Sequence, residues 1–293
     1  MVGQRGIRYL GWVSFFLLPS LIGLTIFTLI PILSSLGLTL FEWDLLTPPR
    51  FVGWGNFQRL IHDQNFQVAL AHTLYFIVGY IPLVMVIALG VAVMLNQKLK
   101  GVILLRTAFF IPVVSAWVAV ALLWMWIFNP KFGIVNYLLG LVGVQGPAWL
   151  FDPQWAMPAV IITSVWKDIG FVMVMFLAGL QGIPTEYYEA AAIDGAGGWQ
   201  RFCHITLPLL SPTTFFALII SLINSFQVFD QVWIMTGGGP AGATSVLVEQ
   251  IVKNAFSYSR MGYAAALSWV LFLLVFSATA FQMRLQKHWV TYD

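Results

Sequence analysis

Charged residues are scarce in this chain of 293 residues. Lysine, arginine, aspartate and glutamate together make up 9% of it, whereas a water-soluble domain carries about a quarter. Aromatic residues are plentiful instead, with 13 tryptophans and 24 phenylalanines. Intrinsic disorder is excluded, because it requires high charge and few aromatic residues. An ordinary soluble enzyme is excluded too, because so few charges cannot cover a surface in water. The composition therefore predicts an integral membrane protein with several spans.

Residues that bind metals or nucleotides are also missing. The single cysteine, Cys203, permits neither an internal disulfide nor a cysteine-based metal site. The four histidines are scattered, without an HExxH pair. The chain has no Gly-Lys-Ser or Gly-Lys-Thr of a phosphate-binding loop, and its net charge of +3 is too small to argue for nucleic acid. We therefore expect no metal and no cofactor in this chain, and no ATP hydrolysis by it alone.

Long uncharged stretches mark the expected spans, since a membrane helix needs about 20 mostly apolar residues. We predict six spans in one transmembrane domain, at residues 10–41, 69–95, 106–128, 155–180, 207–235 and 263–283. The first stretch is too long for the apolar region of a signal peptide, so we interpret it as a retained span. Residues 132–151 are uncharged as well, but their glycines and Pro147 favour an external loop with a short interfacial helix.

The distribution of lysine and arginine predicts the orientation. With six spans and both termini inside, eight cations lie on the inner side and five on the outer side. The inner ones are Arg5, Arg8, Lys98, Lys100, Arg106, Arg201, Arg284 and Lys287. The outer ones are Arg50, Arg59, Lys131, Lys253 and Arg260.

The loop at residues 183–206 carries the most specific pattern. We expect a short helix with Thr185 as its N-cap, an end at Asp194-Gly195, and a second short helix before the next span. Glycine at that end tolerates the left-handed backbone conformation. Pro208 suits the first turn of the following helix, where its missing N–H is not needed. Three successive alanines, 190–192, leave a helix surface that another protein can approach closely.

The same loop resembles a known family. Glu-Ala-Ala, three residues, Gly, nine residues and Ile-x-Leu-Pro is the cytoplasmic loop signature of permease subunits of bacterial ABC importers. It is met by Glu189, Ala190, Ala191, Gly195 and the segment 205–208. The resemblance extends over nearly the whole chain to the branch that imports sugars of the maltose and glycerol-3-phosphate type. An amphipathic loop lying on the bilayer surface is the alternative interpretation of the segment.

The resemblance implies a fold, partners and a place in the cell. It implies the six-helix fold of type I importers in the bacterial inner membrane, working with a second homologous permease, two ATPase subunits and an external solute-binding protein. ATP and magnesium would be bound by the ATPase subunits. The 183–206 loop would dock on the ATPase through the residues Glu189, Ala190, Ala191, Asp194 and Gly195.

Polar residues inside two spans indicate a pathway, because ionisable groups at this depth are costly and tend to be functional. Ser164, Lys167, Asp168 and Phe171 share one face of the fourth span, by helical periodicity. Ser221, Asn224, Ser225 and Gln231 occupy one arc of the fifth. Hydroxyl and amide groups beside an aromatic ring suit a sugar.

The resemblance points to the same two walls. The substrate contacts that it implies are Trp117, Lys167, Asp168, Phe171, Ser221, Asn224 and Ser225. An equally weighted interpretation is that Lys167 and Asp168 form structural ion pairs, for instance with Asp230, or hold a subunit interface.

Our leading hypothesis is a non-catalytic permease subunit of an importer for a sugar, polyol or glycoside. An intramembrane hydrolase or transferase would need a nucleophile–base pair or metal ligands on facing spans, and the sequence displays neither. A secondary transporter working alone would usually show two inverted repeats, and none is detectable.

Overall fold

A computed structural model describes residues 3–97 and 100–291, so Lys98 of the inner cations lies outside the described residues. The regular secondary structure of the described residues is helical apart from one pair of two-residue strands. Four helices are long and apolar enough to cross a membrane, and two bent helix pairs raise the number to six if each pair is one span. This agrees with the six predicted spans. The chain divides into two compact units, which are described separately.

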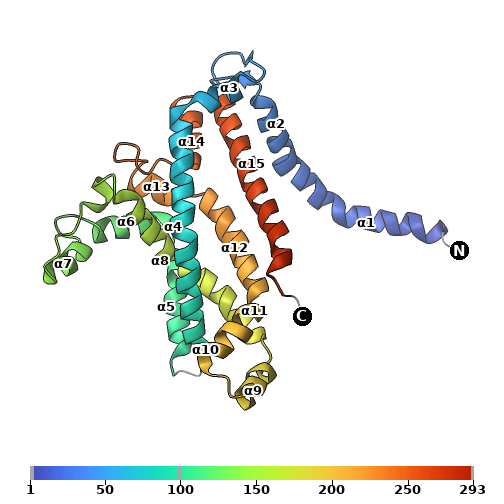
Figure 1. Cartoon of the computed structure of the whole chain (residues 1–293). Coiled ribbons are helices and arrows are strands. Elements are labelled where there is room, and N and C mark those ends of the chain that lie inside the picture. Colours follow the sequence, from blue (N-terminus) through green and yellow to red (C-terminus); the bar gives the residue numbers. More distant parts are fainter. Residues whose placement is uncertain (1–2, 98–99, 292–293) are drawn as a thin grey trace. The chain divides into compact units, whose positions relative to one another are not determined.

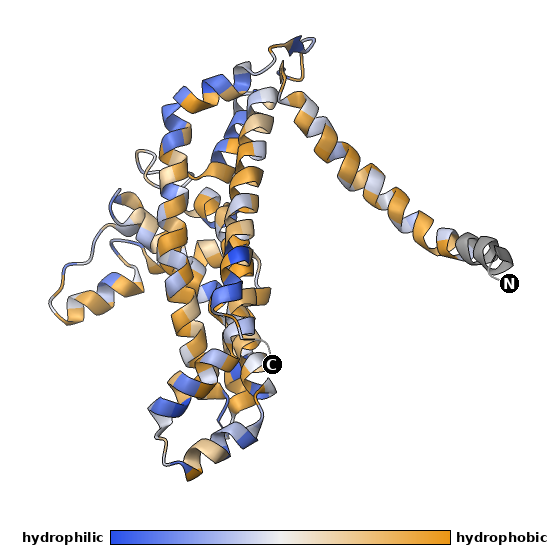
Figure 2. Ribbon diagram, turned by 45° about the vertical axis from the view of Figure 1, so that its right-hand side comes forward, coloured by the Kyte–Doolittle hydropathy of each residue, from blue (hydrophilic) through white to orange (hydrophobic). Residues whose placement is uncertain are grey.

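The first unit joins the described part of residues 1–63 to Ile251–Val270. It begins with α1 (Gly3–Leu24), a π-helical turn (Thr25–Leu29) and α2 (Ile30–Leu38), which together cover most of the first predicted span. The π turn precedes Pro31 in the sequence. Because proline lacks an N–H and its ring crowds the carbonyl four residues earlier, the helix widens there instead of continuing regularly. From Trp12 to Leu38 the two helices are strongly apolar and unburied, and Figure 2 colours most of this stretch hydrophobic.

The rest of the first unit is a small polar structure. Strands β1 (Phe41–Glu42) and β2 (Arg50–Phe51) pair antiparallel, with Glu42 opposite Arg50. Helix α3 (Gly55–His62) follows. The second segment of the unit contains a π turn (Lys253–Ser257) and the start of α15 (Met261–Leu285), which corresponds to the sixth predicted span.

The second unit joins Gln64–Gln250 to the described part of residues 271–293. Helices α4 (Gln64–Leu95) and α8 (Ala156–Gly182) pack along each other and form its centre (Figure 1). Phe76, Tyr80 and Val84 of α4 recur every four residues, so they lie on one face and are buried. The opposing α8 side chains include Met173 and Phe176, which are fully buried.

The third predicted span is bent. The chain bends by 102° between helices α5 (Val102–Val114) and α6 (Trp117–Ile127). Ser115 and Ala116 adopt extended backbone angles between them, one turn after Pro112. Helix α5 crosses α8 so closely that a Cβ atom at Gly170 would collide with the carbonyl oxygen of Phe109. The absence of a side chain at that position therefore permits this crossing.

The uncharged stretch 132–151 forms no long helix. It contains α7 (Ile134–Leu141) and a 3-10 turn (Trp149–Phe151), as the loop interpretation expected. The side chain of Asn136 fastens the loop: its Nδ2 donates to the Pro147 carbonyl at 3.1 Å, and its Oδ1 accepts from Trp149 Nε1 at 2.6 Å.

The fifth predicted span, 207–235, is divided in the structure. Two short helices, α10 (Gly198–Arg201) and α11 (Leu207–Leu209), flank a π turn (Phe202–Thr206) and lead into α12 (Ser211–Phe226). Residues 227–229 separate α12 from α13 (Asp230–Met235), so the stretch is not one continuous helix. Helix α14 (Leu247–Val252) begins in this unit, and a 3-10 turn (Gln286–His288) follows α15.

Candidate functional site

The loop at residues 183–206 contains a helix that ends as its sequence predicts. Helix α9 (Thr185–Ile193) is followed by Asp194 and by Gly195, whose φ is +79°. The N–H of Gly195 donates to Ala192 and the N–H of Ala196 donates to Ala191, at 3.1 and 2.8 Å. This is the Schellman pattern, which satisfies the last carbonyl groups of a helix and requires a left-handed residue. Only the start differs, because Thr185 is the first helical residue and Pro184 takes the N-cap position.

The surface of this loop combines exposed acids with exposed apolar side chains. Glu186 and Glu189 of α9 are exposed. Ile193 is 87% exposed and Trp199 of α10 is 76% exposed. Exposed large apolar groups that lie among polar residues are typical of a protein interaction surface.

Helix α9 is fastened on its other side. Tyr188 packs against the core of the second unit, and its hydroxyl shares a hydrogen bond of 3.0 Å with the Thr206 hydroxyl of the π turn. A cavity of about 370 Å³ lies between the end of α9 and the next turn, lined by residues such as Ala191, Gly195 and Arg201. The hydrogen bond between Tyr188 and Thr206 thus links α9 to the π turn that leads into α12.

A second candidate site is a polar cavity of about 280 Å³ within the second unit. Four of its lining residues were predicted as substrate contacts: Trp117, Asp168, Asn224 and Ser225. They come from α6, α8 and α12, which are separate segments of the chain. The bend before α6 places Trp117 at the start of that helix, and the end of α12 supplies Asn224 and Ser225.

Asp168 is held in this cavity by a tyrosine. The Tyr80 hydroxyl donates to Asp168 Oδ2 at 2.8 Å, and the Tyr80 ring stacks on Phe76 with the centroids 5.3 Å apart. Both aromatic residues also line the cavity. Sequence reasoning missed them, although their spacing of four residues on an otherwise apolar span was an available signal.

Lys167 has a different environment from its neighbour. Its side chain is buried, and the ammonium group donates to the Val113 carbonyl at 3.0 Å. The same group lies 4.9 Å from the centre of the Trp117 ring. Because α5 ends at Val114, this carbonyl lacks an intrahelical partner, and a cation there also complements the helix dipole. Lys167 thus caps the broken end of α5 and adjoins the cavity through the ring of Trp117.

Two other predicted substrate contacts, Phe171 and Ser221, are not among the residues that line the cavity. Phe171 is 40% exposed, and Ser221 is buried in α12. Gln231 lies on α13, beyond the break at 227–229. The prediction that it shares one helix with Ser221 is therefore wrong. Gln231 nevertheless lines the cavity, and its Nε2 donates to Ser164 Oγ at 3.1 Å. The break at 227–229 brings a further set of polar residues to the cavity, namely Gln227, Asp230 and Gln231.

Comparisons with known proteins agree with these features. Residues 84–290 match the family described as binding-protein-dependent transport system inner membrane component. The chain is 38% identical over 283 residues to the probable ABC transporter permease protein YesP of Bacillus subtilis (strain 168), covering 95% of this chain and 91% of that protein. It is 39% identical over 271 residues to the lactose transport system permease protein LacF of Rhizobium radiobacter, covering 90% of each.

A third relative and two solved structures extend the comparison. The trehalose/maltose transport system permease protein MalF of Thermococcus litoralis is 34% identical over 272 residues, covering 92% of each chain. A bacterial ABC transporter for import of the acidic polysaccharide alginate has a TM-score of 0.82 at 26% identity, covering 96% of this chain and 98% of that one. A second alginate transporter structure, with a periplasmic protein that holds an alginate pentasaccharide, has a TM-score of 0.84 at 24% identity, covering 98% and 97%.

These matches confirm the resemblance seen in the loop. The relatives are named as permease proteins, which are transport components and not enzymes. The apolar helices and the family description together make the chain a multi-pass protein of the cytoplasmic membrane. The chain therefore belongs to the family of inner membrane components of binding-protein-dependent transport systems, the permease subunits of ABC importers.

Proposed function

We propose that this permease carries a sugar, polyol or glycoside through a pathway that includes the 280 Å³ cavity. The observation that carries the proposal is the lining of that cavity, where an indole ring, a carboxylate, an amide and a hydroxyl come together. An aromatic ring can stack on the C–H face of a sugar, while the polar groups bond its hydroxyls. The lactose and trehalose/maltose permeases among the relatives support this class of solute.

Each cavity residue has a distinct role in the proposal. Trp117 offers its ring for stacking, and its position is supported by the ammonium group of Lys167. Asp168 and Asn224 bond hydroxyl groups of the solute, with Asp168 oriented by Tyr80. The carboxylate can accept two or more hydrogen bonds, so contact with Tyr80 leaves capacity for a solute hydroxyl.

The proposal includes the partners that complete the pathway. The chain would form half of it, with a second homologous permease as the other half. Two ATPase subunits would bind ATP with its magnesium ion, and a solute-binding protein would deliver the solute from outside. Closure of the ATPase would displace α9 through Glu189, Ala190, Ala191, Asp194 and Gly195, and α9 would pass the movement on through Tyr188.

Uptake kinetics test the proposed pathway. Asp168→Asn should raise the half-saturation concentration for uptake about tenfold or more, because a charged hydrogen bond contributes on the order of 1.5–3 kcal/mol. Asn224→Ala should raise it by a smaller factor, because a neutral hydrogen bond contributes about 0.5–1.5 kcal/mol. The complex should still assemble and keep its basal ATPase activity. Gln97→Ala is the control, because Gln97 lines a different cavity of the second unit. Assembled variants with unchanged uptake kinetics would remove these residues from the pathway.

A further inference from the structure

The polar cavity of the second unit has acidic groups in its lining but no cationic side chain. Asp168 of α8 and Asp230 of α13 both contribute carboxylates, and none of the lining residues is a lysine, arginine or histidine. Lys167 adjoins the cavity through the ring of Trp117, and its ammonium group donates to the Val113 carbonyl at 3.0 Å. The lining by itself therefore carries an excess of negative charge.

The two carboxylates of the cavity differ in their partners. Asp168 is half-buried and accepts a hydrogen bond of 2.8 Å from the Tyr80 hydroxyl. Asp230 is exposed where it lines the cavity. Within the part of the chain that the structure describes, the Asp230 carboxylate has no hydrogen-bond or ion-pair partner. Both of its oxygen atoms are therefore available to a donor group of the solute.

Aromatic rings form another part of the lining. They belong to Phe76, Tyr80, Trp117 and Phe229. Phe76 and Tyr80 stack with their centroids 5.3 Å apart, so these two rings support each other. The Trp117 ring already holds one ammonium group, that of Lys167, at 4.9 Å from its centre. Because the faces of aromatic rings attract positive charge, this lining suits an organic cation.

A metal ion matches the same lining less well than an organic cation does. Among the described residues, no group of three or more histidine, cysteine, aspartate and glutamate side chains could hold a metal ion. Calcium and magnesium ions require a shell of about six or more oxygen ligands, whereas aromatic rings occupy much of this lining. An ammonium group needs only one carboxylate and can also contact the ring faces.

We propose that the permease is specific for an amino sugar, whose ammonium group is bound by Asp230 beside the aromatic rings. The inference rests on the proposed function, because it names the class of solute for the same cavity. The sugar hydroxyls bond Asp168 and Asn224, and the amine supplies the positive charge that the lining lacks. A carboxylate in a partly desolvated cavity is costly without a charged partner, so a cationic solute gains more there than a neutral one. An acidic sugar would bring a like charge to two carboxylates and is excluded.

Binding of matched sugars to the assembled transporter in lipid nanodiscs tests the proposal, because no solute-binding protein is then present to select the solute. The four probes share one type of sugar ring. Glucosamine carries an amine, N-acetylglucosamine carries the same nitrogen without its charge, glucose carries a hydroxyl there, and glucuronate adds a carboxylate. In saturation-transfer NMR at a pH at which glucosamine is cationic, glucosamine should bind about tenfold more tightly than glucose or N-acetylglucosamine, as expected of a charged hydrogen bond. Glucuronate should bind most weakly.

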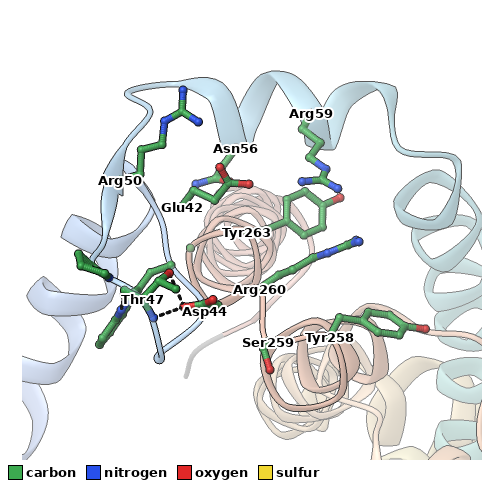
Figure 3. A pocket seen from close by; sticks show the side chains of 13 residues that line it. Glu42, Asp44, Thr47, Arg50, Asn56, Arg59, Tyr258, Ser259, Arg260 and Tyr263 are labelled. Carbon is green, nitrogen blue, oxygen red and sulfur yellow. Dashed lines mark hydrogen bonds between the residues drawn. The ribbon is translucent and has the colours of Figure 1, made fainter.

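A nearly isosteric substitution assigns the preference to one carboxylate. Asp230→Asn should remove the preference for glucosamine and leave the affinity for glucose nearly unchanged, which also shows that the variant is folded. Glu42→Gln is the matched control and should keep the preference. Glu42 is an exposed acid that lines a separate pocket of about 480 Å³ in the first unit (Figure 3).

The possible outcomes separate this inference from the function on which it rests. If the parent transporter binds none of the four sugars, the proposed pathway and the inference both fail. If it binds glucose or glucuronate at least as tightly as glucosamine, or if Asp230→Asn retains the preference, only the inference fails. Sodium NMR examines the other source of positive charge. If sodium binds to the parent transporter and Asp230→Asn abolishes that binding, the carboxylate holds an inorganic cation and the inference is wrong.

Discussion

At the scale of single residues, two adjacent charged side chains in α8 have different surroundings. Asp168 lines the polar cavity and accepts a hydrogen bond from Tyr80. Lys167 is turned to the end of α5, where Val113 offers a carbonyl that the helix itself does not satisfy. Successive residues on a helix diverge by about 100°, so the side chains of Lys167 and Asp168 cannot point in the same direction. The structure thus separates a group that can meet solute from a group that supports a helix end.

Substitution of Lys167 should consequently affect stability before affinity. Lys167→Met leaves the half-buried Val113 carbonyl without its charged donor, which we expect to cost about 1–3 kcal/mol. Thermal unfolding of the purified transporter measures this, and Asn224→Ala serves as the control because Asn224 is exposed in the cavity. A Lys167→Met variant of unchanged stability but altered uptake affinity would instead make Lys167 a solute contact.

Gly195 is a second residue at which the backbone conformation restricts substitution. Nothing lies within 4 Å of a Cβ atom at this position, so space is not the restriction. The restriction is the φ of +79°, which a β-branched residue adopts at a cost of roughly 1–3 kcal/mol. Gly195→Val should therefore unravel the end of α9 and abolish solute-stimulated ATPase activity.

The control for this substitution is Gly182→Ala, at a helical glycine that also has open space around it. Glu189→Lys offers an independent variant, since it reverses a charge on the exposed side of α9 without altering the backbone. If both Gly195→Val and Glu189→Lys retain normal solute-stimulated ATPase activity, α9 is not the coupling element.

At the scale of elements, breaks in helices assemble the polar cavity of the second unit. The bend between α5 and α6 sets Trp117 at a helix start, and the break after α12 adds Gln227 and Gln231 to the lining. Irregular backbone in a membrane protein is tolerated where it is buried in protein or lines a water-filled cavity. The breaks and the cavity are therefore two aspects of one arrangement.

The crossing of α5 and α8 gives a prediction at this scale. Gly170→Ala places a methyl group against the Phe109 carbonyl, and the helices must separate to accommodate it. We expect a loss of about 1–3 kcal/mol in stability, typical of overpacking, together with a shift of Lys167 from the end of α5. Gly90→Ala of α4 is the control, because its Cβ would meet nothing within 4 Å. Equal unfolding temperatures for the two variants would mean that the close crossing is absent.

At the scale of the whole molecule, the charge distribution predicts the orientation in the membrane, and this prediction is open to direct measurement. The structure indicates which positions are suitable for cysteine labelling. Cys203 is half-buried and Asn136 holds its loop by hydrogen bonds, so neither is a suitable labelling site. Ile193 and Tyr137 are 87% and 66% exposed and lie on loops predicted for opposite sides of the membrane.

In a Cys203→Ser background, an impermeant thiol reagent should label Tyr137→Cys in intact cells and Ile193→Cys only after permeabilisation. Because both side chains are exposed, a difference in labelling between the two variants reflects access of the reagent across the membrane and not the reactivity of the thiol. The reverse pattern, with membrane integrity verified, would invert the predicted orientation.

Sequence alone determined the membrane class, the apolar segments and the end of α9. These features depend on local composition and on backbone preferences, such as the left-handed conformation at Gly195. The pattern of the 183–206 loop was also sufficient to identify the family, because its fixed long spacing is specific.

Tertiary structure decided which polar residues meet. Periodicity assigned Lys167 and Asp168 to one face, but the free carbonyl at the end of α5 attracts Lys167 away from the cavity. Periodicity also assumed one helix through Gln231, whereas a break after Phe226 brings that residue to the cavity by another route. The 480 Å³ pocket of the first unit, lined by Arg59 and Arg260, had no local signal in the sequence. These two residues are 201 positions apart, and the contact of β1 with the start of α15 brings their segments together. Contacts between distant segments depend on packing, and packing is not encoded in any single window of the sequence.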